Sequence, residues 1–435
     1  MLTSVAQGII PARGRKKRGK QRQEIGVCPL CDETMRQNTT TRFWKGTPLP
    51  LFALTIFVSA FLLFQVQPLI AKSILPWFGG AASVWTTCML FFQCILLLGY
   101  LYAHASTSRL NHKNQGRIHI LLLLVSLLSL PILPREILKP SGAEEPTGRI
   151  LLVLLLTVGL PYFLLSTTSS LMQAWYTTMQ RAQGGEANYP FRLYALSNLG
   201  SVLGLVTYPF FIEPVLTLKM QVYIWSASYR LFILCAGLIA YKVLKLTARQ
   251  AKENHEEEGI AEEIPTPPER KEYVQWAFLA MMGSVLLLTV STHISQNVAA
   301  IPFLWVLPLS LYLFSFILCF GSTEWIWRPS FAPMPMIGIA MLAFGVLTTT
   351  RNIDVKILIP MFAFALFVTC VLCHGELARL KPHPRYLTGY YLMLSVGGAF
   401  CKCGGSTPLS RLLRVSHRYS RSLSYSSVYH LPRAG

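Results

Sequence analysis

Polar side chains interrupt several long apolar runs of this 435-residue chain, and they are the first candidates for chemistry. Gln65 and Gln67 stand beside Pro68 near the end of the first run, and Gln93 lies in the second run. A primary amide inside a bilayer is costly unless it finds a hydrogen-bond partner. These amides, and Asn198 in the fifth run, are therefore predicted either to hold neighbouring helices together or to line a path for a solute.

A second polar cluster, residues 292–297, follows the seventh apolar run. It includes His293, Gln296 and Asn297, and we expect the backbone to leave the helix here, near the outer face of the membrane. A histidine can change its charge near neutral pH, so His293 is a candidate for a solute path. A polar extracytoplasmic loop without a further role is the alternative interpretation.

Three residues are candidates for coupling transport to an ion, because they can carry a charge at the end of an apolar run. Glu213 follows the fifth run, and His374 and Glu376 end the tenth. A proton-coupling carboxylate must be buried, whereas Glu213 next to Pro214 also fits a hydrated position at the membrane surface. His374 and Glu376 alone cannot make a metal site, which needs three or four ligands.

Catalytic and cofactor motifs are missing from the sequence: it has no nucleotide-binding loop, no GxSxG motif and no HExxH motif. We predict no catalytic residue and no cofactor. Cys28 and Cys31 form a CxxC pair, but no second pair of ligands follows nearby, so a metal site there has little support. Six other cysteines lie inside apolar runs, where a free thiol behaves as a small hydrophobic side chain.

The composition places these residues in a membrane protein. The chain is 52% hydrophobic and 13% charged, with a mean hydropathy of +0.44, whereas soluble domains carry about 25% charged residues. The net charge of +20 is concentrated at the termini and in alternate loops. Membranes sort Lys and Arg to the cytoplasmic side in this way, so the expected partner is the lipid bilayer and not a nucleic acid.

The apolar runs predict an all-α polytopic bundle with about 10–11 spans, because a helix needs about 20 residues to cross hydrocarbon. The runs are 49–70, 81–102, 118–133, 150–172, 193–212, 222–241, 276–292, 301–320, 331–349, 357–373 and the shorter 386–400.

An acidic, proline-containing segment divides these runs into two membrane halves. We expect a basic cytoplasmic extension (1–47), a first half of six spans (48–246), a cytoplasmic linker (247–272), a second half of four or five spans (273–400) and a tail (401–435). The excess of Lys and Arg on one side predicts a cytoplasmic N-terminus in the plasma (inner) membrane. Because 386–400 is short and 401–435 lacks periodicity, we expect an incomplete last span and a disordered tail, and a frameshift is one explanation of the tail's composition.

Several segments resemble the membrane domain of bacterial fused proteins that join a major-facilitator-like region to a spermidine-synthase-like domain. The resemblance lies in 61–72, 75–80, 84–93, 194–201, 292–293, 304–309 and 373–378. It implies a facilitator-like fold over residues 48–400. The synthase-like domain of that family would follow further helices and is lacking here, so no residue inherits an aminopropyltransferase site.

The leading functional hypothesis is a transporter-like module for a small solute, based on the two halves and on the amides and prolines within spans. The alternative is a membrane anchor or regulator for a polyamine-synthase-like partner, and a truncated product is a third reading. A carrier requires polar side chains from both halves to converge on one cavity, whereas an anchor does not.

Overall fold

The computed structural model describes residues 49–78, 82–139, 146–182, 190–253, 266–297, 304–321, 331, 333–348 and 354–403. All of them belong to the unit Thr47–Gly435, to which the account is confined. Cys28, Cys31 and the tail beyond Cys403 lie outside the described residues, as do the side chains of Gln296 and Asn297.

The described part of the chain contains helices and connecting turns and no strand. The helices of the first half are α2 (Leu49–Phe78), α3 (Ala82–Arg109), α4 (His112–Ser126), α5 (Pro146–Leu154), α6 (Leu160–Arg181), α7 (Pro190–Thr207), α8 (Glu213–Val215) and α9 (Leu218–Glu253). Short helical turns follow α4 (Leu127–Ser129) and precede α5 (Glu136–Leu138), and π-helical turns join α5 to α6 (Leu155–Gly159) and α7 to α8 (Tyr208–Ile212). The helices of the second half are α10 (Arg270–Asn297), α11 (Val306–Gly321), α12 (Met334–Thr348), α13 (Val355–Arg379) and, after a turn at Pro384–Tyr386, α14 (Leu387–Cys403).

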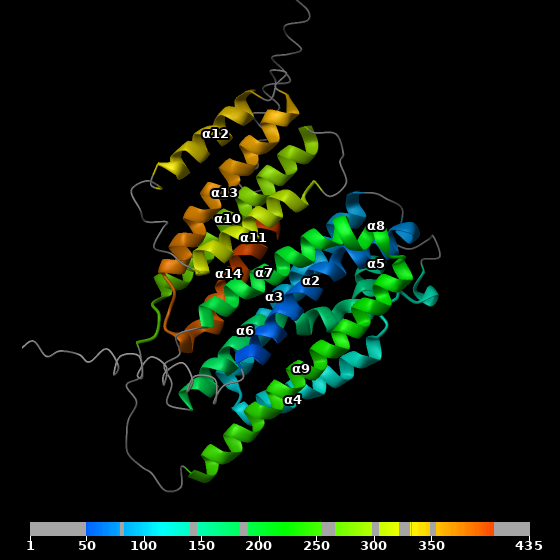
Figure 1. Ribbon diagram of the computed structural model, residues 1–435, viewed down its shortest axis with the longest axis vertical. Coiled ribbons are helices and arrows are strands. Elements are labelled where there is room, and N and C mark those ends of the chain that lie inside the picture. Colours follow the sequence, from blue (N-terminus) through cyan, green and yellow to red (C-terminus); the bar gives the residue numbers. More distant parts are fainter. Residues whose placement is uncertain are drawn as a thin grey trace, which may run out of the picture. The chain divides into compact units, whose positions relative to one another are not determined.

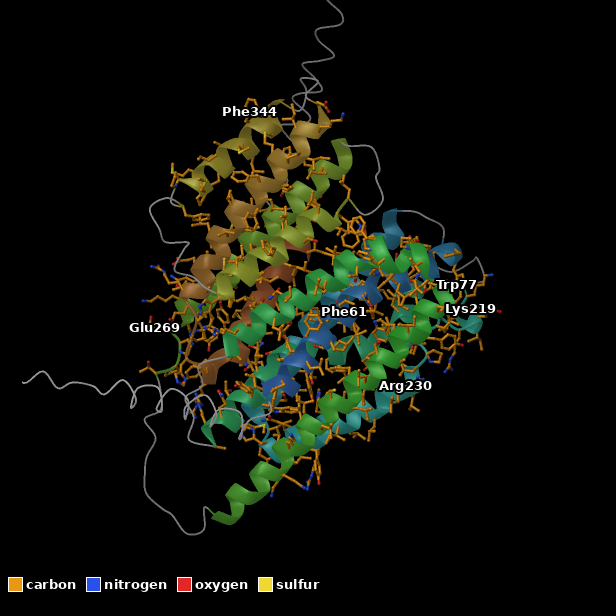
Figure 2. All side chains as sticks on the ribbon, in the orientation of Figure 1. Phe61, Trp77, Lys219, Arg230, Glu269 and Phe344 are labelled. Atoms are coloured by element: carbon orange, nitrogen blue, oxygen red, sulfur yellow. The ribbon has the colours of Figure 1, made fainter. Side chains whose placement is uncertain are left out.

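Each of the eleven predicted apolar runs overlaps one of these helices or a helix continued through a π-turn, although residues 130–133, at the end of the run 118–133, are not helical. Seven described helical segments are long and apolar enough to cross a bilayer, and α11 and α12 are shorter apolar helices. Charged side chains such as Lys219 and Glu269 lie at helix ends (Figure 2). The prediction of an all-α, polytopic membrane bundle is confirmed.

The two halves repeat one packing pattern (Figure 1). In the first half α2 packs against α6 and α7, and α3 packs against α6; in the second half α10 packs against α13 and α14, and α11 packs against α13. Contacts between the halves run mainly from α7 to α11 and from α3 to α14.

Glycines bring the corresponding helix pairs unusually close. A Cβ added to Gly200 of α7 would lie 2.6 Å from the carbonyl oxygen of Phe57 and 3.4 Å from the Cβ of Ala60, both on α2. Small residues allow helix backbones to approach in this way in membranes.

The second half has the same arrangement. A Cβ added to Gly397 of α14 would collide with the carbonyl oxygen of Ala277 and lie 3.0 Å from the Cβ of Ala280, both on α10. Gly200 and Gly397 therefore occupy matching places in two structural repeats.

One helix differs from what the sequence predicted, and the length of another can be compared with its prediction. Helix α10 continues to Asn297, so the expectation that the backbone leaves the helix at 292–297 is wrong. No proline or glycine interrupts this stretch before Pro302, and polar side chains at the end of a span do not break a helix. Helix α14, expected to be an incomplete span, has 17 residues, fewer than the about 20 that a span needs, and packs against α10 and α3, with Tyr390 and Tyr391 fully buried.

Candidate solute-binding cavity

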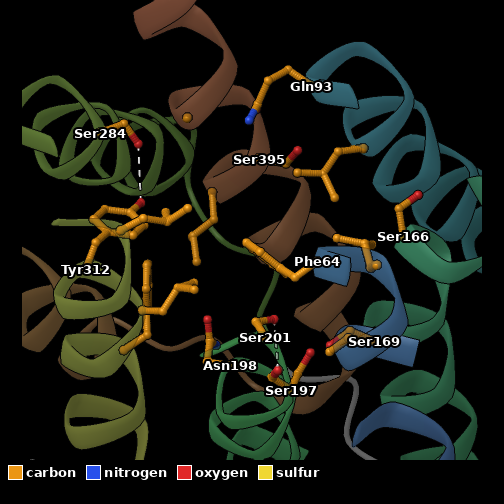
Figure 3. Close-up of a pocket in the computed structure, with 18 of the residues that line it drawn as sticks. Phe64, Gln93, Ser166, Ser169, Ser197, Asn198, Ser201, Ser284, Tyr312 and Ser395 are labelled. Carbon is orange, nitrogen blue, oxygen red and sulfur yellow. Dashed lines mark hydrogen bonds between the residues drawn. The ribbon is translucent and has the colours of Figure 1, made fainter. Parts of the chain in front are cut away.

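A cavity of about 420 Å³ lies between the two halves of the bundle. Its walls come from α2, α3, α6 and α7 of the first half and from α10, α11 and α14 of the second (Figure 3). All seven helices belong to the packing pattern that repeats between the halves. Both repeats therefore contribute to the wall of the cavity.

Uncharged polar groups from both halves face this space. The amides are Gln67, Gln93 and Asn198. Eight serines also line it: Ser59, Ser166, Ser169, Ser197, Ser201, Ser284, Ser291 and Ser395. Several of these hydroxyls donate within their own helix, as Ser201 does to the carbonyl oxygen of Ser197 at 3.0 Å (Figure 3). A hydroxyl that donates in this way keeps lone pairs that can accept from a ligand.

Aromatic side chains form the rest of the polar wall. Tyr162 accepts a hydrogen bond of 3.1 Å from the amide Nε2 of Gln67, and the hydroxyls of Tyr312 and Ser284 lie 3.3 Å apart. The other aromatic residues of the wall are Phe64, Tyr100, Tyr194, Trp305, Phe316 and Tyr391.

One end of the cavity is closed by contacts between the halves. The rings of Tyr194 and Tyr391 stack at 4.7 Å with an interplanar angle of 15°. The Tyr391 hydroxyl donates to Oε1 of Gln173 on α6 at 2.8 Å. Farther toward the same end, Nδ1 of His104 on α3 lies 3.2 Å from Oγ1 of Thr388 on α14.

The loop after α13 adds two contacts to this closed end. Nη2 of Arg181 lies 3.4 Å from Nδ1 of His383, and Nζ of Lys381 lies 5.0 Å from the centre of the Phe191 ring. Burial lowers the pKa of Lys381 from its ordinary value. All of these contacts join helices α3, α6 and α7 of the first half to the part of the second half near the start of α14.

The structure brings together three of the predicted solute-path residues. Gln67, Gln93 and Asn198 line the cavity, and the Nδ2 of Asn198 donates to the carbonyl oxygen of Tyr194 at 2.9 Å. Gln65 is buried but lies elsewhere, 3.5 Å from the hydroxyl of Thr207 on α7.

His293 does not line the cavity; its ring lies 4.7 Å from the ring of Phe362 on α13. Gln296 and Asn297 are in the last turn of α10, and the structure describes only their backbone.

The candidate ion-coupling residues lie outside the cavity. Glu213 pairs with Lys72 in a partly exposed ion pair, and Glu376 pairs with Arg379 three residues later in α13. His374 is fully buried, with Nδ1 2.7 Å from the Ser315 hydroxyl. The described residues contain no group of three or more potential metal ligands.

His374 contacts two residues of the cavity wall on the side that faces away from the cavity. Its ring stacks on Phe316 at a centroid distance of 3.6 Å and meets the Tyr312 ring edge-on at 4.8 Å. Its Nε2 has no hydrogen-bond partner among the described residues and faces Gly283 of α10.

Sequence reasoning missed most of the wall, namely the serines and tyrosines. Serine and tyrosine are common in spans, so their types alone mark no site. One signal was available: Tyr194 and Tyr391 each precede a tightly packed glycine by six residues, in α7 and α14.

The described arrangement is similar to two solved transporter structures. The major facilitator superfamily proton:xylose symporter XylE of E. coli, bound to 6-bromo-6-deoxy-D-glucose, matches with a TM-score of 0.50 and 14% identity, over 84% of this chain and 90% of that chain. The human organic anion transporter MFSD10 (TETRAN) matches with a TM-score of 0.51 and 13% identity, over 82% of this chain and 92% of that chain.

The chain has a major-facilitator-like fold. At these identities the likeness concerns the fold alone, and it supports a multi-pass membrane protein. No protein-family model and no curated protein sequence matches the chain. The narrower resemblance to the spermidine-synthase-fused family receives no support from these matches.

Proposed function

We propose that the chain is a membrane carrier that moves a small solute through the cavity between its two halves. The observation that carries the proposal is that polar side chains from both halves line one cavity, whose wall includes the five helices that join the halves, α3, α6, α7, α11 and α14. A solute held there can reach the other side of the membrane only if the closed end opens. The fold supports this reading, because the two solved structures named above are of transporters.

The closed end rests on contacts that can separate. The hydroxyl, amide and imidazole pairs at His104–Thr388 and Tyr391–Gln173 are individual hydrogen bonds, each worth about 1 kcal/mol net. We propose that this end faces the cytoplasm, as the positive-inside rule implies for a cytoplasmic N-terminus in the plasma membrane. The cavity would then be reached from outside in this state.

The alternative function is a membrane anchor or regulator for a spermidine-synthase-like partner, as the resemblance at 61–72 and 194–201 implies. An anchor has no need for a cavity that is reached alternately from two sides. Access to the cavity therefore separates the two functions without knowledge of the solute.

The experiment replaces Gln93 by cysteine and measures, in right-side-out and inside-out vesicles, the labelling by an impermeant thiol reagent that this cysteine adds to that of the native cysteines. A carrier is expected to expose this cysteine to both sides. A His104→Cys/Thr388→Cys pair, oxidised to a disulfide, should hold the inner end closed and leave labelling only from outside; reduction should restore it.

Two controls calibrate the labelling. The chain without added cysteines gives the baseline. Leu98→Cys, on the side of the same helix that faces away from the bundle, should stay unlabelled because Leu98 is exposed to lipid and not to the cavity. If the Gln93→Cys chain is labelled from one side only even when no disulfide is present, the carrier is rejected and the anchor is favoured.

A further inference from the structure

The chemistry of the cavity wall restricts the solute, provided that the carrier function holds. We infer that the cavity binds an uncharged polar solute, one with hydroxyl or amide groups. Every described residue that lines the cavity is uncharged, and the polar side-chain groups of the wall are amides, hydroxyls and the indole N–H of Trp305. Amides can donate and accept hydrogen bonds, and the wall hydroxyls keep lone pairs that accept, which suits a neutral solute that does both.

An ionic solute would lose its hydration without gaining a countercharge. Burial of a charge is strongly unfavourable unless an opposite charge or several hydrogen bonds replace the water. No described charged residue lines the cavity, and the Lys72–Glu213 and Glu376–Arg379 pairs lie outside it, at helix ends.

An organic cation could instead bind to the faces of aromatic rings. Several rings of this wall use their faces on other rings. Tyr194 stacks on Tyr391, and Phe316 stacks on the His374 ring at 3.6 Å. Tyr312 meets Phe316 nearly at right angles, at 5.4 Å and 78°. These ring faces are therefore used within the protein, and choline and spermidine are included as probes because other aromatic residues also line the cavity.

Binding to the purified full-length chain in detergent tests this inference separately from transport, because binding requires no movement between the two sides. D-glucose, D-glucosamine and D-glucuronate share one skeleton and differ in charge; uridine, choline and spermidine complete the probe set. We expect glucose or uridine to raise the thermal unfolding midpoint. The charged hexoses, choline and spermidine should bind at least tenfold more weakly.

Gln93→Glu should change this preference, since it adds a carboxylate to the wall at a residue whose side chain points into the cavity (Figure 3). We expect glucosamine to gain at least tenfold over glucose, with Ser395→Asp as a second variant and Gln93→Met as the uncharged control. Tighter binding of any ion to the unchanged chain, or failure of both neutral probes to bind, would overturn the inference. If the chain fails the labelling experiment but binds the neutral probes, the carrier function is rejected and the inference that the cavity binds a neutral solute still holds.

A second inference comes from a charge on the outer face of the bundle. Arg230 is exposed and lies in the middle of α9 (Figure 2). It stands midway between Leu218 and Lys242, about 18 Å from each at the helical rise per residue. The hydrocarbon core is about 30 Å thick, so Arg230 lies near its centre.

The guanidinium group cannot lose its charge at this depth, and snorkelling serves arginines near helix ends. Exposed apolar residues surround it on the same face of α9, among them Tyr223, Leu231, Leu234 and Leu238. None of the described residues pairs with Arg230, and the described carboxylates lie at or beyond helix ends, so a second copy of this part of the chain offers no carboxylate at that depth.

We propose that this face of α9, from Tyr223 to Leu238, docks a transmembrane helix of another protein that carries an aspartate or glutamate near its centre. The carboxylate would satisfy Arg230, and the apolar residues above and below it would pack against the partner helix. A lipid phosphate is less well matched, because headgroups lie at the membrane surface and Arg230 lies at mid-depth.

A leucine-based transmembrane peptide with one central glutamate is the probe, compared with the same peptide bearing glutamine. Energy transfer to the labelled chain in phosphatidylcholine vesicles should give at least tenfold tighter association with the glutamate peptide. Arg230→Leu should abolish the difference, and Arg230→Glu should transfer it to a peptide with a central lysine. Equal binding of both peptides, or loss of the difference when phosphatidylglycerol is added, would overturn the helix proposal and, in the second case, identify a lipid as the occupant.

Discussion

Replacement of Gly200 by alanine tests the closest helix contact of the first half. The new Cβ would lie 2.6 Å from the carbonyl oxygen of Phe57, and ordinary contacts begin near 3.4 Å, so α7 must move from α2 by about 0.8 Å. A gap of this size forfeits about a third of each dispersion well of about 0.15 kcal/mol. If about 40 atom pairs are affected, the loss is about 2 kcal/mol, within the range of about 1–3 kcal/mol for overpacking.

Gly397→Ala should behave in the same way, because its Cβ would meet the carbonyl oxygen of Ala277 and the Cβ of Ala280 on α10. Gly237→Ala on α9 is the matched control, since an added Cβ there has no heavy atom within 4 Å. The control should be neutral or gain up to about 1 kcal/mol from helix propensity.

The assay is thermal unfolding of the purified chain in detergent. The fraction of protein that stays monodisperse is measured at each temperature. The midpoint should fall by several degrees for Gly200→Ala and Gly397→Ala and should stay or rise for Gly237→Ala. If the three variants are equally stable, the close approach of α7 to α2 and of α14 to α10 does not carry the packing, and the reasoning from matching repeats fails.

Two further predictions concern polar contacts. Tyr391→Phe leaves the buried Oε1 of Gln173 without its donor, and it should cost about 1–3 kcal/mol in the same unfolding assay, with a smaller loss once Gln173 is also replaced by leucine. Lys72→Ala removes an ion pair with Glu213 whose side chains are 44% and 31% exposed, and because solvent screens such a pair the loss should stay below about 1 kcal/mol. A larger loss for Lys72→Ala, or none for Tyr391→Phe, would contradict these assignments.

The helices could be predicted from the sequence because the bilayer leaves little choice. A segment in hydrocarbon must satisfy its own backbone hydrogen bonds, so every long apolar run becomes a helix. The helices extend past the predicted runs, as α2 does to Phe78 and α9 to Glu253, since apolarity marks the hydrocarbon core and not the ends of the helix.

The cavity was harder to predict because it depends on which side of each helix faces inward. Gln65 and Gln67 are two residues apart, which turns their side chains by about 200° around the helix. Gln67 accordingly faces the cavity, whereas Gln65 faces Thr207 on α7. Arg230 was missed for a related reason: its run, 222–241, is apolar on average, and a mean hides one charge.

The internal repeat links the closed end to the helix packing. Tyr194 and Tyr391 each stand six residues before a glycine that holds its helix against the first helix of its own half, α2 or α10. The two rings then meet face to face between the halves. Each tyrosine is thereby attached to a tightly packed helix pair. If the side chain of Tyr391 moved alone, both the ring stack and the Tyr391–Gln173 hydrogen bond would be lost. Opening of this end is therefore expected to move α2 with α7 and α10 with α14 as two rigid pairs.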